Sequence, residues 1–217
     1  LGAGGFWDAI EAMGGDRLTP GQGVDALSEA IDIIRGIWDA GDRTPLRAGG
    51  EYHSVSGAKR GPAPAHDIPI WIGALKPRML RLIGTKGDGW LPSLPYLQPG
   101  DLAAGNAAID RAAADAGRDP REIRRLLNVG GAIGAEEIIR LALEDGVSTF
   151  IIMGDDPAAM QRFAELMPDI RDAVAAGRAA SGTPQGPARG EAALAKRREG
   201  IAYDEVPVSL AASTVEP

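Results

Sequence analysis

The sequence of 217 residues contains no cysteine and two histidines, His53 and His66. The lack of cysteine excludes a disulfide framework, thiolate zinc sites, iron–sulfur clusters and a cysteine nucleophile. Two histidines argue against a multi-histidine metal centre, so we predict no bound metal. Both lie in an irregular stretch, residues 41–67, where we expect a long loop with a short hairpin around Tyr52 and solvent-exposed histidine side chains.

Long apolar runs and excess positive charge are also missing. No run approaches the roughly 18 residues of a membrane-spanning helix, and no signal peptide opens the chain. Lys and Arg number 23 against 30 Asp and Glu, a net charge of −7, whereas a nucleic-acid groove needs clustered cations. We predict a cytoplasmic homo-oligomer with a small-molecule substrate and with no nucleic-acid or membrane partner.

Apolar periodicity predicts alternating helices and strands over residues 1–176. The strongest helix, residues 20–39, opens on a Thr19–Gln22 capping box with Pro20 in its first turn. Its apolar stripe consists of Val24, Leu27, Ile31, Ile34 and Trp38. Short apolar runs at 68–72, 88–92, 126–129 and 148–153 read as strands, with helices starting at Lys76 and spanning 99–116, 135–144 and 157–175. This alternation predicts parallel βα units in an α/β fold.

Residues 177–217 differ from the preceding part. Gly and Pro, 30 and 16 in the whole chain, make up about 21% of it, against roughly 12% in average proteins. The segment RAASGTPQGPARG reads as a linker, and the remainder has little periodicity. We predict that 177–217 form a flexible linker or C-terminal extension.

The predicted strands end in glycine and lead into helix N-termini. Unpaired amides and the helix dipole favour anions there, and in a (β/α) barrel these ends share the catalytic face. The sequence carries no nucleophile elbow, P-loop or complete dinucleotide fingerprint. The pattern therefore predicts a site for a phosphate-bearing cofactor without naming the cofactor.

Several motifs, taken in order, resemble the bacterial luciferase-like flavin- or deazaflavin-dependent oxidoreductases. They are LGAGGFWDAIEAMGG, the Gly50-Glu51-Tyr52 turn, Pro62-Ala63-Pro64, IPIWIGALKPRMLRLIG and GDGWLP. The resemblance covers residues 1–176 and implies a (β/α)8 TIM barrel that binds FMN or F420 at the carboxyl ends of its strands. It also implies that the opening motif lies at the end of the fourth strand. We therefore expect that three βα units are absent here and that the chain carries strand four's end through strand eight.

The resemblance also implies the cofactor-binding residues. They are Gly2, Gly4, Asp8, Gly73, Ala74, Leu75 and, at a later helix start, Gly134. Each has a plainer interpretation: the glycines turn the chain, Asp8 complements a helix dipole, and Gly73, Ala74 and Leu75 merely end a strand. The sequence assigns no catalytic residue.

Two functions remain open at this point. The first is an oxidoreductase or monooxygenase acting on a small organic substrate, in which reduced FMN activates oxygen or F420 carries a hydride. The spacing in LGAGGFWD is closer to the F420 branch. The alternative is a non-catalytic flavin-binding or partner subunit with a truncated barrel, whose open strand edge needs a cover.

Overall fold

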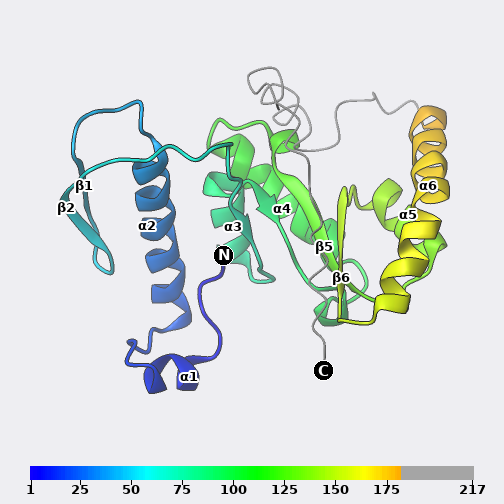
Figure 1. Cartoon of the computed structure of the whole chain (residues 1–217), viewed down its shortest axis with the longest axis horizontal. Helices are drawn as coiled ribbons and strands as arrows, with labels where there is room; N and C mark the ends of the chain where they lie inside the picture. The colour runs from blue at the N-terminus through cyan, green and yellow to red at the C-terminus, as the bar shows by residue number, and fades with distance from the viewer. Residues whose placement is uncertain (182–217) are drawn as a thin grey trace, which may run out of the picture.

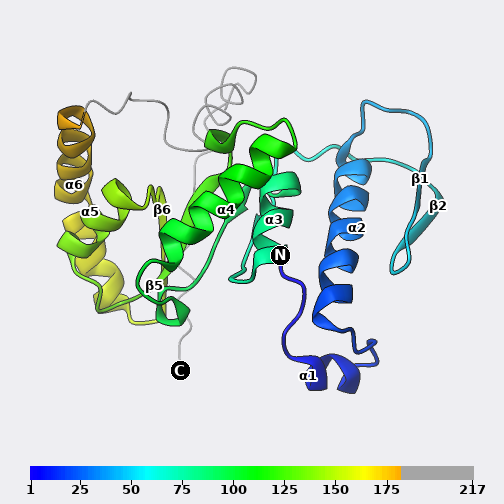
Figure 2. The ribbon, with the colours of Figure 1, turned by 180° about the vertical axis from the view of Figure 1, so that it is seen from behind.

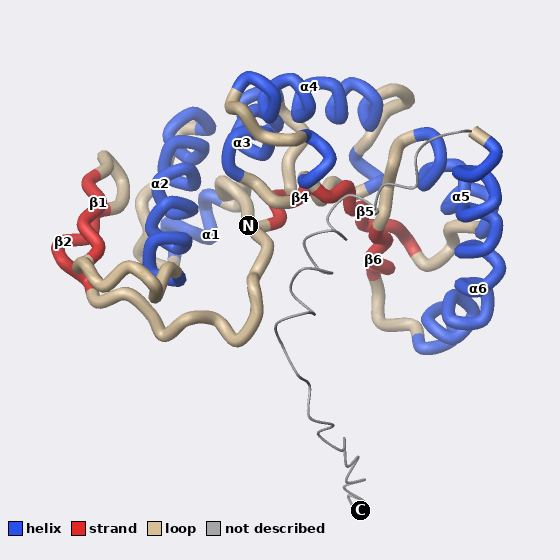
Figure 3. The backbone as a smooth tube through the Cα atoms, turned by 90° about the horizontal axis from the view of Figure 1, so that it is seen from above, coloured by secondary structure: helices blue, strands red, loops and turns tan. Residues whose placement is uncertain are grey.

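A four-stranded parallel sheet forms the centre of the computed structural model, which describes residues 1–181. Strands β3 (Trp71–Ile72), β4 (Gly89–Trp90), β5 (Arg124–Gly130) and β6 (Thr149–Met153) are neighbours in chain order. They follow the inner side of an arc of helices (Figure 3). The predicted α/β class and the parallel order of all four strands are confirmed.

Leu1 extends the sheet beyond β3. Its main-chain nitrogen donates to the carbonyl oxygen of Trp71 at 2.6 Å, and the N–H of Gly73 donates to the Leu1 carbonyl oxygen at 3.1 Å. Bonds to the two residues that flank Ile72 are the pattern of a parallel pair. The opening of the chain therefore lies where the resemblance puts the end of the strand preceding β3.

The predicted strand bounds differ from the observed ones: the strand predicted at 88–92 spans only Gly89–Trp90, and the strand predicted at 148–153 begins at Thr149. The strand predicted at 68–72 begins at Trp71, and Ile68 is exposed. Pro69 has no N–H for a ladder, and the N–H of Ile70 donates to the Asp88 side chain instead. The strand predicted at 126–129 extends over 124–130, because Arg124 and Arg125 pair with β4.

Within residues 1–181, six α-helices accompany the strands. They are α1 (Trp7–Ala12), α2 (Pro20–Trp38), α3 (Pro77–Lys86), α4 (Asp101–Asp115), α5 (Ala135–Glu144) and α6 (Pro157–Ala180). Seen from behind, α3 and α4 cover one face of the sheet, and α5 and α6 pack together at one end (Figure 2). None of the helices within residues 1–181 is long and apolar enough to cross a membrane.

Helix α2 forms as predicted. Thr19 accepts the N–H of Gln22, and the Gln22 side chain accepts the N–H of Thr19, which completes the capping box. Leu27 and Ile31 are buried in the main core with Ile72, Ile83 and Trp90. The rest of the predicted stripe packs against this cluster, so α2 is held by its apolar face.

The loop predicted over 41–67 contains the expected hairpin, which lies beside α2 (Figure 1). Strand β1 (Leu46–Gly49) pairs antiparallel with β2 (Ser54–Ala58). Glu29 of α2 accepts the backbone N–H groups of Glu51, Tyr52 and His53 at 2.8–3.0 Å. An added Cβ at Gly50 would overlap this carboxylate, which explains the glycine in the turn. His53 and His66 are exposed, as predicted.

Close contacts between the outer helices depend on glycine. An added Cβ at Gly84 of α3 would lie 2.6 Å from the Ala112 Cβ of α4. At Gly105 of α4 it would overlap the indole of Trp90, which is 2% exposed. These two glycines let α4 approach α3 and β4.

Helix α6 runs to Ala180, past the end predicted at residue 175. Its apolar face buries Phe163 and Ile170 against Ile138 of α5. The remainder of the predicted extension, residues 182–217, lies outside the described residues.

We predict that Ile31→Asp lowers the free energy of unfolding by about 3–5 kcal/mol, because it buries an unpaired charge at a fully buried position. Denaturant unfolding measures the change. Ile33→Asp is the matched control, since Ile33 is partly exposed, and it is expected to cost about 1 kcal/mol. Equal losses in the two variants would contradict the burial of the Ile31 stripe.

The hairpin is expected to loosen in acid. Partial burial favours protonated Glu29, but the N–H groups of His53, Tyr52 and Glu51 together outweigh it and lower the pKa of Glu29 below its ordinary 4.5. A folded pKa below the unfolded one means that the stabilisation is complete above the unfolded pKa and is lost as pH falls through the folded pKa. The protection factors of the amides of residues 51–53 against hydrogen exchange should fall as the pH is lowered through the folded pKa of Glu29. In Glu29→Gln this fall in the protection factors should disappear, and in Glu51→Gln it should persist.

Candidate functional site

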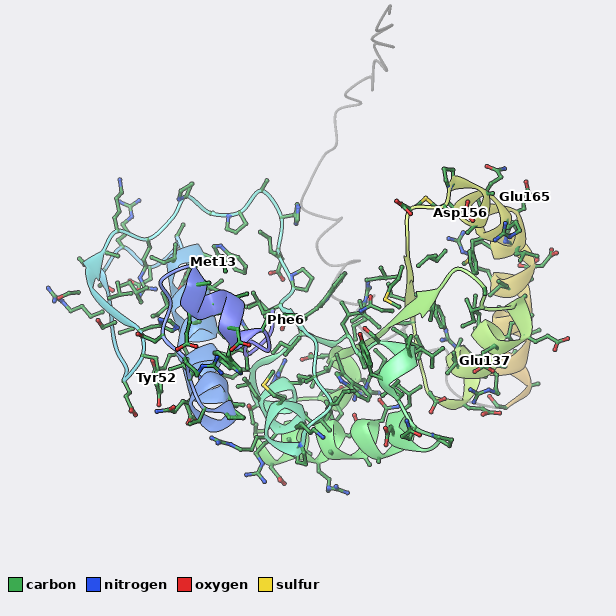
Figure 4. The ribbon with its side chains drawn as sticks, turned by 90° about the horizontal axis from the view of Figure 1, so that it is seen from below. Phe6, Met13, Tyr52, Glu137, Asp156 and Glu165 are labelled. Atoms are coloured by element: carbon green, nitrogen blue, oxygen red, sulfur yellow. The ribbon has the colours of Figure 1, made fainter. Side chains whose placement is uncertain are left out.

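The predicted site residues gather at one edge of the molecule. Parallel strands end together, so the segments 2–5, 73–76, 91–93, 131–134 and 154–156 form what we call the carboxyl edge. Gly2, Gly4, Gly73, Ala74, Leu75 and Gly134 all lie on it. Figure 4 looks onto this edge, with Phe6 beside α1 and Asp156 at the start of α6.

The segment 73–76 has unused hydrogen-bond donors. Within residues 1–181, the main-chain N–H groups of Ala74, Leu75 and Lys76 have no acceptor. The N–H of Gly73 donates to the carbonyl oxygen of Leu1 at 3.1 Å and is not one of these donors. The indole Nε1 of Trp90 donates to the Ala74 carbonyl oxygen at 2.8 Å and so fixes the segment. Three consecutive donors are thus held in place without a partner.

The helix that follows strengthens this position. Helix α3 begins at Pro77 without a side-chain cap, and Lys76 adds positive charge at its start, while Arg78 forms an ion pair with Asp25 at 2.9 Å. Helix α5 also begins uncapped, after Gly134, but Glu136 and Glu137 lie in its first turn. Because carboxylates already complement that helix end, α3 is the better place for an anion.

The other predicted residues have different surroundings. Gly4 has a φ of 88°, a value that favours glycine, and an added Cβ there would lie 2.9 Å from the Trp7 ring. Gly2 and Gly134 have open space where a Cβ would be. Asp8 lies in α1 and forms an ion pair with Arg17, its side chain almost fully exposed. Asp8 is therefore engaged within its own segment.

A cavity of about 330 Å³ opens at the carboxyl edge between β5 and α6. Its walls are largely apolar and include Ile152, Met153 and Met160, with Asp155, Asp156 and Arg162 as the charged lining residues. A pocket of this size falls within the range of small-molecule sites.

A larger hollow of about 400 Å³ lies at the opposite, amino edge of the sheet. There Asp88 accepts two hydrogen bonds from Arg35 at 2.9 Å and one from the N–H of Ile70 at 2.8 Å. Burial lowers the pKa of Arg118, Asp88 opposes that shift and Arg35 adds to it. Arg118 donates to the carbonyl oxygens of Gly84 and Gly87. These charges are used to hold segments together, so we assign this hollow to stability.

Sequence reasoning placed Trp90 near a strand end but missed its hydrogen bond, and it missed Ser93 and Asn128 at the carboxyl edge. Trp90 positions the 73–76 segment, and the Asn128 side chain donates to the Ser93 hydroxyl at 3.1 Å. A polar residue within the apolar run LLNVG is a signal that could have identified Asn128. Among the described residues no group of acidic, histidine and cysteine side chains is arranged for a metal ion.

Comparison with known families identifies the family to which this chain belongs. The sequence model of the luciferase-like monooxygenases matches residues 1–197. The chain belongs to this family. The resemblance seen in the motifs is confirmed, and the match extends beyond the predicted boundary at residue 176.

Curated members of the luciferase-like family match parts of the chain. A phthiodiolone/phenolphthiodiolone dimycocerosates ketoreductase from Mycobacterium kansasii is 35% identical over 46% of this chain and 27% of its own length. A 5,10-methylenetetrahydromethanopterin reductase from Methanolobus tindarius is 30% identical over 70% of this chain and 44% of its own. The chain therefore spans less than half the length of these relatives.

Solved structures of luciferase-like type share the fold. An F420-dependent secondary alcohol dehydrogenase superposes with a TM-score of 0.66 at 18% identity, covering 79% of this chain and 68% of that one. The long-chain alkane monooxygenase LadA gives 0.63 at 13% identity, covering 76% and 59%. The predicted luciferase-like TIM-barrel class is thereby confirmed.

The amino-edge charges are expected to affect stability rather than ligand binding. Asp88→Ala should cost about 2–3 kcal/mol, because it removes charged hydrogen bonds and leaves the Ile70 N–H unpaired. Asp25→Ala breaks the ion pair of Asp25 with Arg78. Both side chains are more than half exposed, so the loss should cost about 0.5 kcal/mol or less. Denaturant unfolding measures both losses. A change in cofactor affinity caused by Asp88→Ala would argue against this assignment.

Proposed function

We propose that this protein is a flavin- or F420-dependent oxidoreductase that acts on a small organic substrate. The observation that carries the proposal is the row of three main-chain N–H groups at residues 74–76, which have no acceptor within residues 1–181 and lie ahead of an uncapped helix. Such a row suits the phosphate of a cofactor, and it lies at the edge where barrel enzymes hold their active sites.

The residues present fit a phosphate-bearing cofactor. Ala74, Leu75 and Lys76 would donate main-chain hydrogen bonds to its phosphate, and the side chain of Lys76 adds charge nearby. When bound, F420 donates or accepts a hydride, and reduced FMN activates dioxygen. Relatives named as F420-dependent support F420, and LadA, named as a monooxygenase, supports the flavin branch. We favour F420, as the spacing of the opening motif does.

In this proposal, the residues of this chain bind and orient the cofactor and the substrate. The Trp90 indole holds the donor segment through the Ala74 carbonyl, and the cavity beside Met153 and Met160 receives part of the substrate. Gly134, with two carboxylates in the following turn, is the weaker anion position. We further propose a cytoplasmic homo-oligomer.

A second candidate is a non-catalytic flavin-binding or partner subunit. Within residues 1–181 no strand pairs with the outer edge of Leu1 or of β6, and free edges of this kind pair with other chains. The reading frame that contains this chain separates the candidates, since upstream βα units favour the enzyme.

Gly73→Val should weaken cofactor binding and leave the fold intact. An added Cβ would lie 3.3 Å from the Leu91 carbonyl oxygen, so a valine at position 73 would have to shift the main chain that leads into the donor segment. We expect the dissociation constant to rise at least tenfold, or about 1.4 kcal/mol. Fluorescence titration with FMN and with F420, using the complete reading frame, measures it.

The matched control is Gly49→Val, whose Cβ would meet open space in the hairpin. It should bind as wild type does, and thermal melts should show that both variants fold. Equal affinities in all three proteins would remove Gly73 from the site. Failure of wild type to bind either cofactor would favour the partner-subunit form of the second candidate.

A further inference from the structure

All the sulfur of this chain is in methionine. The sequence has no cysteine and five methionines, Met13, Met79, Met153, Met160 and Met167. Met79 is buried in the main core, and Met167 is partly buried beside Phe163 and Ile170. Met13, Met153 and Met160 are exposed, with accessible fractions of 80%, 40% and 49%. Because oxidation of thioethers follows their exposure, these three are the methionines that a peroxide reaches first.

Two of the three exposed methionines line one cavity. Met153 ends β6 and Met160 lies near the start of α6, and both belong to the wall of the cavity of about 330 Å³ at the carboxyl edge. Asp156, labelled at the start of α6 in Figure 4, also lines this cavity. Met13 follows α1 and is not a lining residue. A change in the polarity of Met153 and Met160 therefore changes the wall of the cavity itself.

The cavity contains hydrogen-bond donors that have no acceptor. Within residues 1–181, the main-chain N–H groups of Ala132, Gly154 and Asp155 have none. In the same part of the chain, the Arg162 guanidinium forms no hydrogen bond or ion pair. The carboxylates of Asp155 and Asp156 line the cavity too, so a further negative charge is disfavoured. The group that suits these donors is therefore a neutral but strongly polar acceptor oxygen.

Oxidation of methionine produces an oxygen of this kind. Hydrogen peroxide transfers one oxygen atom to the thioether sulfur, so that an S–O bond forms and the O–O bond breaks. The proton of the transferred oxygen passes to the departing hydroxide, which leaves as water. Sulfur is oxidised to the sulfoxide and the peroxide is reduced. The sulfoxide carries no net charge, and its oxygen accepts hydrogen bonds from N–H groups.

We propose that Met153 and Met160 form an oxidation site, at which hydrogen peroxide converts an apolar cavity wall into a polar one and weakens the binding of apolar ligands. Arg162 and the free main-chain N–H groups hold the sulfoxide oxygens. The chain has no thiol, so a separate thiol-dependent reductase has to restore the thioethers. The inference holds with either cofactor and rests on the proposed function only in assigning the cavity to the substrate.

Peptide mass spectrometry of the full chain during exposure to hydrogen peroxide locates the oxidation. We expect Met153 and Met160 to be oxidised roughly tenfold faster than Met79 and Met167, which the fold shields. Equal rates at all four positions would overturn the proposal.

The two epimers of the sulfoxide distinguish a built site from mere exposure. Reductases specific for each epimer measure their amounts. At Met13, which is exposed and outside the cavity, we expect equal amounts of the two. At Met153 and Met160 one epimer should predominate, because the cavity wall shields one side of the sulfur. Arg162→Leu should bring the ratio closer to that of Met13. Equal amounts at positions 153 and 160 in wild type would count against the site.

Binding of N-phenyl-1-naphthylamine, a neutral apolar fluorescent probe, reports the polarity of the cavity. We expect peroxide treatment to raise the dissociation constant of this probe roughly fivefold or more. The double variant Met153→Leu/Met160→Leu keeps the apolar wall without sulfur, so its affinity should not respond to peroxide. Met13→Leu is the matched control and should respond as wild type does. An equal loss of affinity in the double variant, or no binding to untreated wild type, would overturn the proposal.

A polar variant tests the cavity without peroxide. Met153→Gln/Met160→Gln introduces uncharged polar groups, so it should bind the probe as weakly as oxidised wild type does. Thermal melts show whether each protein is folded, and this variant keeps the test decisive where peroxide itself unfolds the chain. Wild-type affinity in the folded variant would overturn the proposal.

Cofactor titration of wild type separates this inference from the proposed function. If neither FMN nor F420 binds, the proposed function fails, and the oxidation and probe measurements, which need no cofactor, still test the cavity. If a cofactor binds and oxidation leaves the affinity for the probe unchanged, the oxidation site fails and the proposed function stands.

Discussion

The carboxylate of Asp88 is the contact on which the arrangement of the sheet depends. It binds Arg35 of α2 and the N–H of Ile70, while its own main chain bonds to Ile70 and Arg124. One residue therefore joins α2 to the starts of β3, β4 and β5. Because the strands are short, fixing their starts also fixes where they end. The contacts at the amino edge therefore determine the positions of the segments at the carboxyl edge.

The two edges treat polar groups in opposite ways. At the amino edge, Asp88, Arg35 and Arg118 satisfy one another and nearby carbonyls. At the carboxyl edge, three sets of polar groups have no partner in the described chain. They are the main-chain N–H groups of residues 74–76, the Asn128 Oδ1 and the hydroxyl hydrogen of Ser93. This contrast between the two edges supports the proposal that a ligand binds at the carboxyl edge.

Local patterns allowed the helices and the strand order to be predicted. The Thr19 capping box and the stripe around Ile31 act over a few residues, so α2 was predicted almost to its ends. The strand before Gly73 was placed too early, because the partner of the Ile70 N–H is the distant side chain of Asp88. The unpaired donors of residues 74–76 and the pairing of Ser93 with Asn128 depend on register, which periodicity does not report. The identity of the cofactor residues stays a prediction.

The close packing of Gly105 on Trp90 affects the carboxyl edge as well as the core. The same indole that lies against Gly105 holds the Ala74 carbonyl, so the volume at position 105 sets where the donor segment lies. Positions 90 and 105 share one space, and evolution can enlarge one only by shrinking the other. A family member with a bulkier residue at 105 should carry a smaller ring at 90 and secure its 74–76 segment by another contact.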